Sequence, residues 1–262
     1  MTAGLRTLPD YIIAGGKRCG STSLQAWLAT HPAVVASHSG KGTHFFDENY
    51  VKGLAWFRGH YPLRVTMRAR ANRHGGRAVT GEASPYYCVH PMAFDRIAEH
   101  LPQVKLVFVV REPVERAYSH WRYEGRRGVE TLDVHAALDA ETDRLRGEEE
   151  RMLEDASYVS WNHRHFSYVT RGQYADQLDR CLRRFPREQV LVLGFSELFG
   201  GGTHSVTRLC DFLKIERVGT PMPREESGGA GSAVPEDVRA RLEPVFADSN
   251  WRLREEFGVA FG

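Results

Sequence analysis

The stretch Tyr11-Ile-Ile-Ala-Gly-Gly-Lys-Arg-Cys-Gly-Ser-Thr-Ser-Leu24 decides the fold of this chain. Its first four residues are apolar and predict a short buried strand, which the two glycines that follow bring to an end. A helix then begins near Gly20, with large apolar residues at the i, i+3, i+4 spacing of one helical face. A strand, a glycine turn and a helix N-terminus bring several backbone N–H groups to one point, at the positive end of the helix dipole. The stretch therefore predicts a binding site for a phosphate or sulfate group.

The loop between this strand and helix also carries suitable side chains. The hydroxyl and cationic residues that could bind an oxyanion are Lys17, Arg18, Ser21, Thr22 and Ser23. Gly15 and Gly20 have the glycine spacing of a nucleotide-triphosphatase P-loop, but the lysine that follows the second glycine in that motif is absent. The cations precede the second glycine instead, so the loop is P-loop-like without being a P-loop.

The rest of the chain alternates predicted strands with predicted helices. We predict strands at 78–81, 105–110 and 190–193, and helices at 91–101, 112–122, 174–185, 205–213 and 238–257. We expect residues 64–77 to be a solvated connection, residues 131–155 an acidic helical cover, and residues 219–235 a loop rich in Gly, Pro and Ser. This alternation favours an α/β fold, a three-layer αβα arrangement around a central parallel sheet, as one domain over residues 1–262. Ligands of such sheets bind beyond the carboxyl ends of the strands, where the opening loop lies.

Composition narrows the class of protein. The chain has 262 residues, of which 42% are hydrophobic and 26% charged, as in an ordinary globular enzyme. A formal charge of +2 gives no reason to expect a nucleic-acid partner. The four cysteines lack metal-ligand spacing, which favours reduced thiols. We also find no secretory signal and no membrane-spanning run, so we expect a cytoplasmic enzyme without a metal.

A second anion site is predicted where the central strand ends. The segment Arg111-Glu-Pro-Val-Glu-Arg-Ala-Tyr-Ser-His-Trp121 follows that strand. P-loop nucleotidases commonly place a magnesium-binding aspartate at this point, whereas this chain has Arg111, with Ser119 two turns along the following helix. A cation and a hydroxyl favour a second phosphate over a metal. The alternative is that the arginine only pairs with Glu112 or Glu115.

These two motifs resemble those of sulfotransferases that use 3′-phosphoadenylyl sulfate (PAPS). Arg18-Cys-Gly-Ser-Thr-Ser-Leu24 is similar to their 5′-phosphosulfate loop, and residues 111–121 match their 3′-phosphate motif. Residues 41–61 and 81–87 resemble segments of heparan-sulfate-type and related bacterial sulfotransferases, and the similarity covers about residues 10–258. The resemblance implies transfer of a sulfuryl group from PAPS to an acceptor hydroxyl, with PAP (3′-phosphoadenosine 5′-phosphate) as the product and no metal.

The resemblance also implies roles for individual residues. Arg18 holds the place of the catalytic cation, with Lys17 beside it, and Arg111 and Ser119 would bind the 3′-phosphate. The implied cofactor-binding residues are Lys17, Arg18, Cys19, Gly20, Ser21, Thr22, Ser23, Arg111, Ser119, Tyr168 and Arg224. For Arg224 only its position in the Gly- and Pro-rich loop supports the assignment.

The general base is the point at which the sequence departs from this family. The glutamate that serves as base in the K-E-x-H-F-F segment of heparan-type enzymes is Gly42 here. Two nearby residues could replace it as catalytic groups: His44, whose imidazole titrates near neutral pH, and Glu82, at the mouth of the second strand. A structural role is the alternative for each, and an acidic acceptor such as a phenol would need no strong base. We favour His44.

Two other functions compete with this interpretation. One is a nucleotide kinase or triphosphatase, which the missing P-loop lysine disfavours. The other is a catalytically impaired protein that binds PAP or PAPS, which Gly42 supports. We expect the acceptor to be a small-molecule or natural-product alcohol, phenol or sugar. Its pocket would be shaped by residues 131–165 and the loops after Gly42 and Tyr87, which bring aromatic and basic side chains together: Tyr86, Tyr87, Tyr158, Trp161, His163, Arg164 and His165.

Overall fold

A computed structural model describes residues 3–40, 42–219, 222–223 and 233–261 of the chain. Within these ranges one sheet forms, in the order β2-β1-β3-β4, and all of its strand pairs are parallel. The strands are β1 (Tyr11–Gly15), β2 (Gly81–Ala83), β3 (Lys105–Val110) and β4 (Val190–Gly194). Two predictions, the role of Arg224 and the start of the segment at Lys41, fall on residues outside the described ranges.

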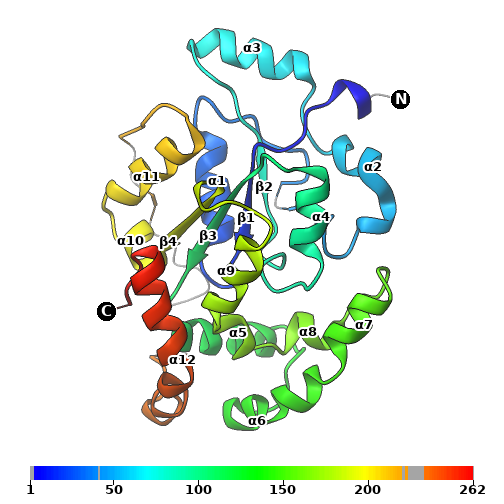
Figure 1. Ribbon diagram of the computed structural model, residues 1–262. Coiled ribbons are helices and arrows are strands. Elements are labelled where there is room, and N and C mark those ends of the chain that lie inside the picture. The colour runs from blue at the N-terminus through cyan, green and yellow to red at the C-terminus, as the bar shows by residue number, and fades with distance from the viewer. Residues whose placement is uncertain (1–2, 41, 220–221, 224–232, 262) are drawn as a thin grey trace.

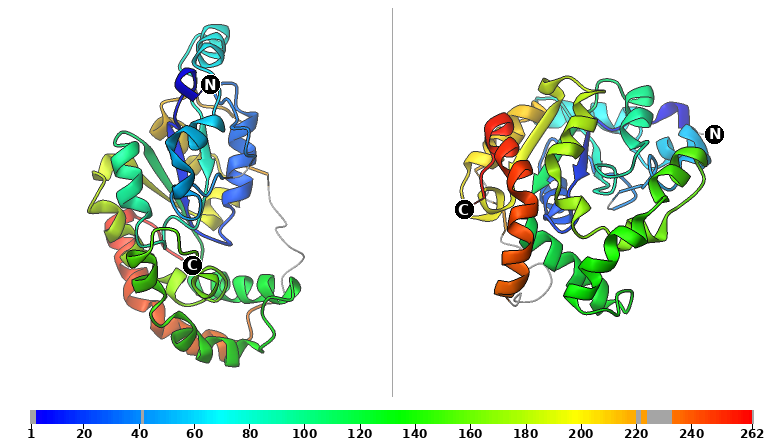
Figure 2. Two further views of the ribbon diagram at one scale, coloured as in Figure 1. Left: turned by 90° about the vertical axis from the view of Figure 1, so that its right-hand side faces the viewer. Right: turned by 60° about the horizontal axis from the view of Figure 1, so that its bottom comes forward.

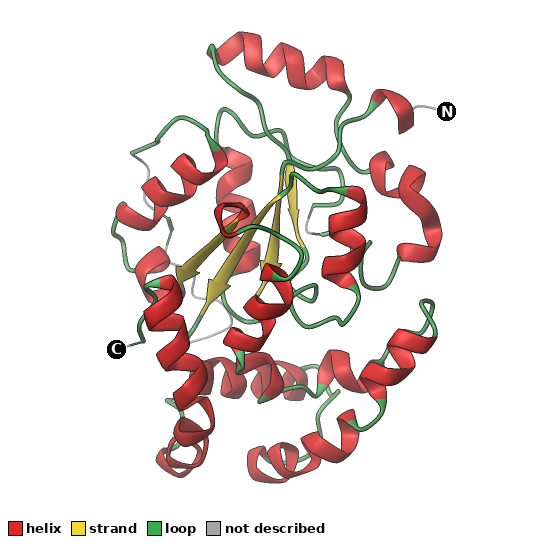
Figure 3. Cartoon of the chain, viewed as in Figure 1, coloured by secondary structure: helices red, strands yellow, loops and turns green. Residues whose placement is uncertain are grey.

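The sheet lies between two layers of helices, which confirms the predicted three-layer α/β fold (Figure 3). One face packs against α1 (Ser21–Thr30), α10 (Phe195–Phe199) and α11 (His204–Leu213). The other face packs against α2 (Gly53–Gly59), α4 (Ala93–His100) and α9 (Tyr174–Leu182). Both faces are apolar because side chains alternate along each strand, so that Phe108 belongs to one core and Val109 to the other.

A further group of helices lies beyond the carboxyl ends of the strands, toward which the arrowheads point in Figure 1. Its members are α5 (Pro113–Arg126), α6 (Val134–Leu145), α7 (Glu148–Glu154), α8 (Trp161–His165) and α12 (Glu236–Phe257). The second view of Figure 2 brings this group forward. Val114, Leu138 and Phe246 join α5, α6 and α12 in a separate small core. These helices therefore form one wall of any site at the end of the sheet.

Short connecting elements complete the described chain. Single 3₁₀ turns form η1 (Ala3–Leu5), η2 (Tyr50–Lys52), η3 (Thr170–Gly172) and η4 (Arg187–Gln189). No helix of the described residues is both long and apolar enough to span a membrane.

Two predictions about local structure were wrong. Residues 78–81 are not the second strand; Val79 forms only an isolated bridge to Val34, and the strand begins at Gly81. The arginine-rich segment is a helix, α3 (Arg64–His74), which ends at Gly75 in the left-handed region and buries none of its residues. The prediction of an acidic helical cover is confirmed; it consists of two helices, because Gly147 has a φ of 73° between α6 and α7.

Candidate functional site

The loop that follows β1 forms an anion cradle at the start of α1. Gly20 has a φ of 83°, and a Cβ atom there would lie 2.5 Å from a ring carbon of Phe199, so only glycine fits. The first turn of α1 has no side-chain N-cap, which leaves its backbone N–H groups available. Ser23 Oγ is buried and has no hydrogen-bond partner in the described part of the chain. An uncapped helix start with hydroxyls beside it fits an oxyanion.

The two cations of the loop point in different directions. Arg18, at a φ of 68°, donates from Nε to Ser119 Oγ at 3.2 Å and lies 4.8 Å from the ring centroid of Tyr123. Lys17 instead donates from Nζ to a carboxylate oxygen of Glu124 at 2.6 Å. The Arg18–Ser119 contact joins the first predicted motif to the second, so the structure brings the two predicted anion sites together.

The second predicted site lies where β3 runs into α5. The Arg111 guanidinium donates to Glu115 Oε2 at 2.8 and 3.0 Å and lies 5.0 Å from the ring centroid of Phe195. Glu112 accepts hydrogen bonds from two backbone N–H groups and caps α5. The alternative prediction, an arginine paired with a glutamate, is therefore present in the structure. Glu115 is 41% exposed, and an ion pair of that kind contributes little enough for a phosphate to replace it.

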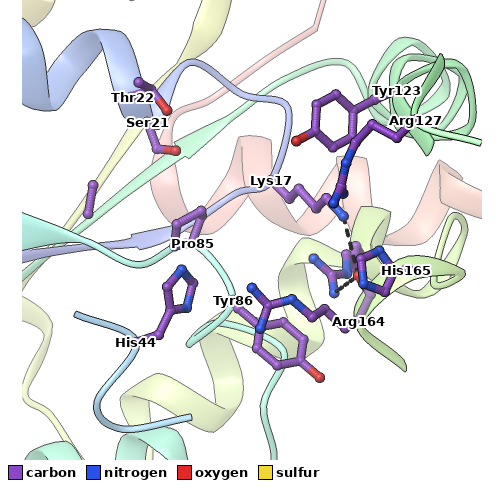
Figure 4. Close-up of a pocket in the computed structure, with 12 residues that line it drawn as sticks. Lys17, Ser21, Thr22, His44, Pro85, Tyr86, Tyr123, Arg127, Arg164 and His165 are labelled. Atoms are coloured by element: carbon purple, nitrogen blue, oxygen red, sulfur yellow. Dashed lines mark hydrogen bonds between the residues drawn. The ribbon is translucent and has the colours of Figure 1, made fainter. Parts of the chain in front are cut away.

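A pocket opens between four parts of the chain: the loop after β1, the carboxyl end of β2, α5 and α8 (Figure 4). Ser21 and Thr22 line it at the start of α1, and Lys17 extends into it from the loop. The remaining lining residues are His44, Ala83, Pro85, Tyr86, Tyr123, Arg127, Arg164, His165 and Arg171. The pocket thus holds two loop hydroxyls beside a set of cationic and aromatic side chains.

His44 lies at the pocket wall with one ring nitrogen engaged. It has a φ of 49°, and its Nδ1 atom is 2.8 Å from Oδ2 of Asp47, whose carboxylate is fully buried. A ring that donates from Nδ1 carries its free lone pair on Nε2. The His44 side chain is 29% exposed, so this second nitrogen is accessible to a ligand.

Donor atoms of His44, Asp47 and Glu48 lie within 4.8 Å of one another, close enough to hold a metal ion. Each group already has a partner, because Glu48 forms an ion pair with Arg164 and Asp47 accepts from His44.

Glu82 was expected to face the same cleft, and this expectation was wrong. The residue is fully buried, and its carboxylate accepts hydrogen bonds from Thr43 N at 2.8 Å and from the Tyr87 hydroxyl at 2.8 Å. Glu82 thus fixes the loop that carries His44. Gly42 packs on the same strand, where an added Cβ would lie 2.3 Å from the Ala83 carbonyl oxygen. A glutamate at position 42 would not fit this backbone.

Two residues assigned to the cofactor are buried away from the pocket. The Tyr168 hydroxyl donates to Glu130 at 2.9 Å within the small core of α5, α6 and α12, so its side chain cannot touch a ligand at the loop. The Cys19 thiol is also fully buried, lies 3.7 Å from the Tyr174 hydroxyl, and has its pKa raised by burial. Cys19 can contribute only its backbone.

Some of the residues predicted to contact the acceptor line the pocket, and others do not. Tyr86, Arg164 and His165 line the pocket, whereas His163 lies behind it and Trp161 is 58% exposed. The pocket residues that sequence reasoning missed are Tyr123, Arg127 and Arg171. Tyr123 and Arg127 follow Ser119 by four and eight residues on one helical run, and this spacing is the signal that could have found them.

Comparison with known proteins is consistent with this geometry. Residues 8–224 match the sulfotransferase domain family. Heparan sulfate glucosamine 3-O-sulfotransferase 6 of Mus musculus is 30% identical over 283 residues, which cover 99% of this chain and 75% of the relative. Heparan sulfate glucosamine 3-O-sulfotransferase 3B1 of Mus musculus is 32% identical, and the match covers 97% of this chain but 62% of that relative. The crystal structure of a sulfotransferase from Alicyclobacillus acidocaldarius superposes with a TM-score of 0.70 at 25% identity, covering 97% of this chain and 98% of that one.

Proposed function

The chain belongs to the sulfotransferase family, and from that premise we propose that it transfers a sulfuryl group from PAPS to a hydroxyl of an acceptor. The observation that carries the proposal is the contact between Arg18 and Ser119, at 3.2 Å. The contact supports the proposal because it joins the two motifs to which we assign the 5′-phosphosulfate and the 3′-phosphate of one nucleotide.

The residues at these sites fit such a donor. The uncapped N-terminus of α1, with Ser21 and Thr22, would bind the 5′-phosphosulfate, and Arg111 and Ser119 the 3′-phosphate. When bound, PAPS supplies the sulfuryl group together with a phosphate leaving group. The chain's own part is to neutralise the charge that develops there and to remove the acceptor proton.

We assign proton removal to His44. Its Nε2 lone pair would accept the acceptor's hydroxyl proton, and the buried Asp47 carboxylate would hold the ring in the required tautomer and stabilise the imidazolium. This assignment removes the difficulty posed by Gly42. The contacts of Glu82 favour a structural role for that residue, because both of its carboxylate oxygens are already hydrogen-bonded inside the protein.

The charge of the pocket favours an acidic acceptor. Among the described residues that line it, none carries a carboxylate, whereas three carry a permanent positive charge beyond the loop: Arg127, Arg164 and Arg171. Arg171 also lies 4.9 Å from the ring centroid of Tyr86, which provides a flat apolar surface. We propose a small hydroxyl-bearing acceptor, such as a phenol or sugar, that also carries a carboxylate, phosphate or sulfate group. A cytoplasmic location stays a prediction.

The test is transfer of label from ³⁵S-PAPS to acceptors in buffer containing EDTA. Matched pairs of acceptors, such as 4-hydroxybenzoate against phenol, separate the charge requirement from the hydroxyl requirement. We expect labelled product without added metal, and more of it with the acidic member of each pair. Tight PAP binding without turnover on any acceptor would instead identify a binding protein, and a requirement for ATP and magnesium would identify a kinase.

A further inference from the structure

Glu124, on the inner side of α5, is a buried charge for which the proposed reaction has no use. Its side chain is fully buried, and one of its oxygens receives the Lys17 ammonium at 2.6 Å. The other groups around the carboxylate are His165 Nδ1 at 3.0 Å, Arg127 Nη1 at 3.2 Å and His120 Nε2 at 3.4 Å. Burying a carboxylate is unfavourable unless its charge is compensated, so this arrangement calls for an explanation.

Lys17 is the member of this group that reaches the pocket. Its Nζ atom bridges the two walls, since it donates to Glu124 on α5 and, at 3.2 Å, to the carbonyl oxygen of Arg164 in α8. These two contacts hold the ammonium at the wall of the pocket, on the side of Arg164 and His165 (Figure 4), and Ser21 and Thr22 line the same pocket. Arg18 contacts a different residue of the same helix, Ser119.

We infer that Glu124 is a positioning residue, which keeps Lys17 charged and aimed into the pocket so that Lys17 stabilises the charge developing on the transferred group. The inference rests on the proposed function and adds a second cation to it. Arg18 remains with the 3′-phosphate side of the site, and the short loop supplies one cation to each end of the donor.

The electrostatic surroundings explain why Lys17 needs such a partner. Burial lowers the pKa of Lys17 well below its ordinary value, and Arg171 and Arg164 lower it further, whereas Glu124 raises it. Burial on its own would raise the pKa of Glu124, but hydrogen bonds from His120, His165 and Lys17 outweigh this effect and keep it ionised. Burial also lowers the pKa of His120, so that ring is neutral. Lys17 and Arg127 are thus the cations that balance Glu124, and Lys17 makes the shorter contact.

The ionisation of Lys17 can be measured without any substrate. The chain has five lysines, so a protein labelled with [ε-¹³C]lysine gives few NMR resonances, and K17R identifies the one from Lys17. Groups that face Lys17 are His120, Tyr123, Glu124 and Arg127 from α5, Arg164 and His165 from α8, Arg171 from η3, and Arg18 from the loop. In E124Q we expect the pKa of Lys17 to fall by about one unit or more, because a carboxylate within hydrogen-bond distance is lost.

The matched control is E130Q. Glu130 is another buried carboxylate, paired with Arg144 at 2.5 Å and with Tyr168, but it lies away from the pocket. E130Q should lower stability and leave the Lys17 titration unchanged. Equal Lys17 titrations in E124Q and the wild type would overturn the inference.

Turnover of ³⁵S-PAPS adds a second readout. A charged Lys17 supports activity below its pKa, and activity is lost as the pH rises through that value, so E124Q should lose activity at lower pH than the wild type. K17M should lower kcat about 100-fold or more while PAP affinity changes little. A K17M enzyme with normal kcat, or activity that appears only as Lys17 deprotonates, would overturn the inference. If E124Q does not fold, the kcat of K17M tests the inference in its place. A wild type that turns over no PAPS refutes the proposed function, while the NMR titration still tests the pairing.

Discussion

The Nδ1 atom of His44 lies 2.8 Å from Oδ2 of Asp47, and His44 lines the pocket while Asp47 is buried behind it, in the loop that lacks the family's glutamate. Asp47 is itself fixed, because its other oxygen accepts the backbone N–H of Glu48 at 2.6 Å. A buried carboxylate behind an accessible imidazole orients the ring. This pair gives the chain a candidate base without a residue at position 42.

The first prediction concerns this pair. H44Q should lower kcat by about 100- to 10,000-fold, because general-base catalysis is lost, and D47N should give a smaller loss through the wrong tautomer. PAP affinity should stay near the wild-type value in both variants. Rates with ³⁵S-PAPS and calorimetric titration with PAP measure the two effects, and an H44Q enzyme of normal kcat would exclude His44 as the base.

The second prediction concerns the nucleotide's 3′ end. R111A and S119A should each weaken PAP binding, R111A by about 1.5–3 kcal/mol because a charged hydrogen bond to the phosphate is removed. R252A is the matched control, since Arg252 pairs with Asp179 and Glu256 on helices α9 and α12. Isothermal calorimetry reports all three affinities. If R252A weakens binding as much as R111A, the 3′-phosphate assignment fails.

The third prediction concerns Gly42. A Cβ atom at this position would lie 2.1 Å from Ser84 Oγ and 2.3 Å from the Ala83 carbonyl oxygen, and the backbone oxygen cannot rotate away. G42A should therefore destabilise the fold by about 1–3 kcal/mol, as overpacking does, and G42E should fail to restore a base. G59A is the control, because nothing lies within 4 Å of the corresponding Cβ. Urea unfolding compares them, and a fully stable G42A protein would contradict the packing described.

The fourth prediction concerns acid stability. Burial lowers the pKa of His90 from 6.5 to about 4. The unfolded chain therefore binds a proton that the folded chain excludes, so stability is complete above pH 6.5 and declines as the pH falls toward 4. This residue alone accounts for about 3 kcal/mol over that window. Urea unfolding of H90Q at several pH values should show a shallower decline than the wild type, and H204Q, an exposed histidine, should not. Parallel curves for H90Q and wild type would contradict the assignment.

Much of this architecture could be predicted from local patterns. The strand at 105–110 was predicted with its observed bounds because an apolar, β-branched run buried on both faces has one interpretation. The loop after β1 was predictable from its glycines. The helix at 64–74 was not predicted, because the density of charge in this segment indicated a solvated connection. Two other features favour the helix: arginine has a high helix propensity, and Gly75 provides a C-terminal cap.

The candidate site was less predictable because its geometry depends on distant partners. The direction of Lys17 is set by Glu124, which lies 107 residues further along the chain. The burial of Tyr168 follows from the packing of α5, α6 and α12 and has no local signature. Motif spacing therefore predicted the two anion sites, while the different contacts of Lys17 and Arg18 needed the folded chain.

The most direct test of the central claim is calorimetric binding of PAP in buffer containing EDTA, for the wild type, R111A and S21A. The account predicts binding without metal that both substitutions weaken, because each removes a ligand of one of the two phosphates. An absence of PAP binding, or binding of ATP with magnesium in its place, would contradict it.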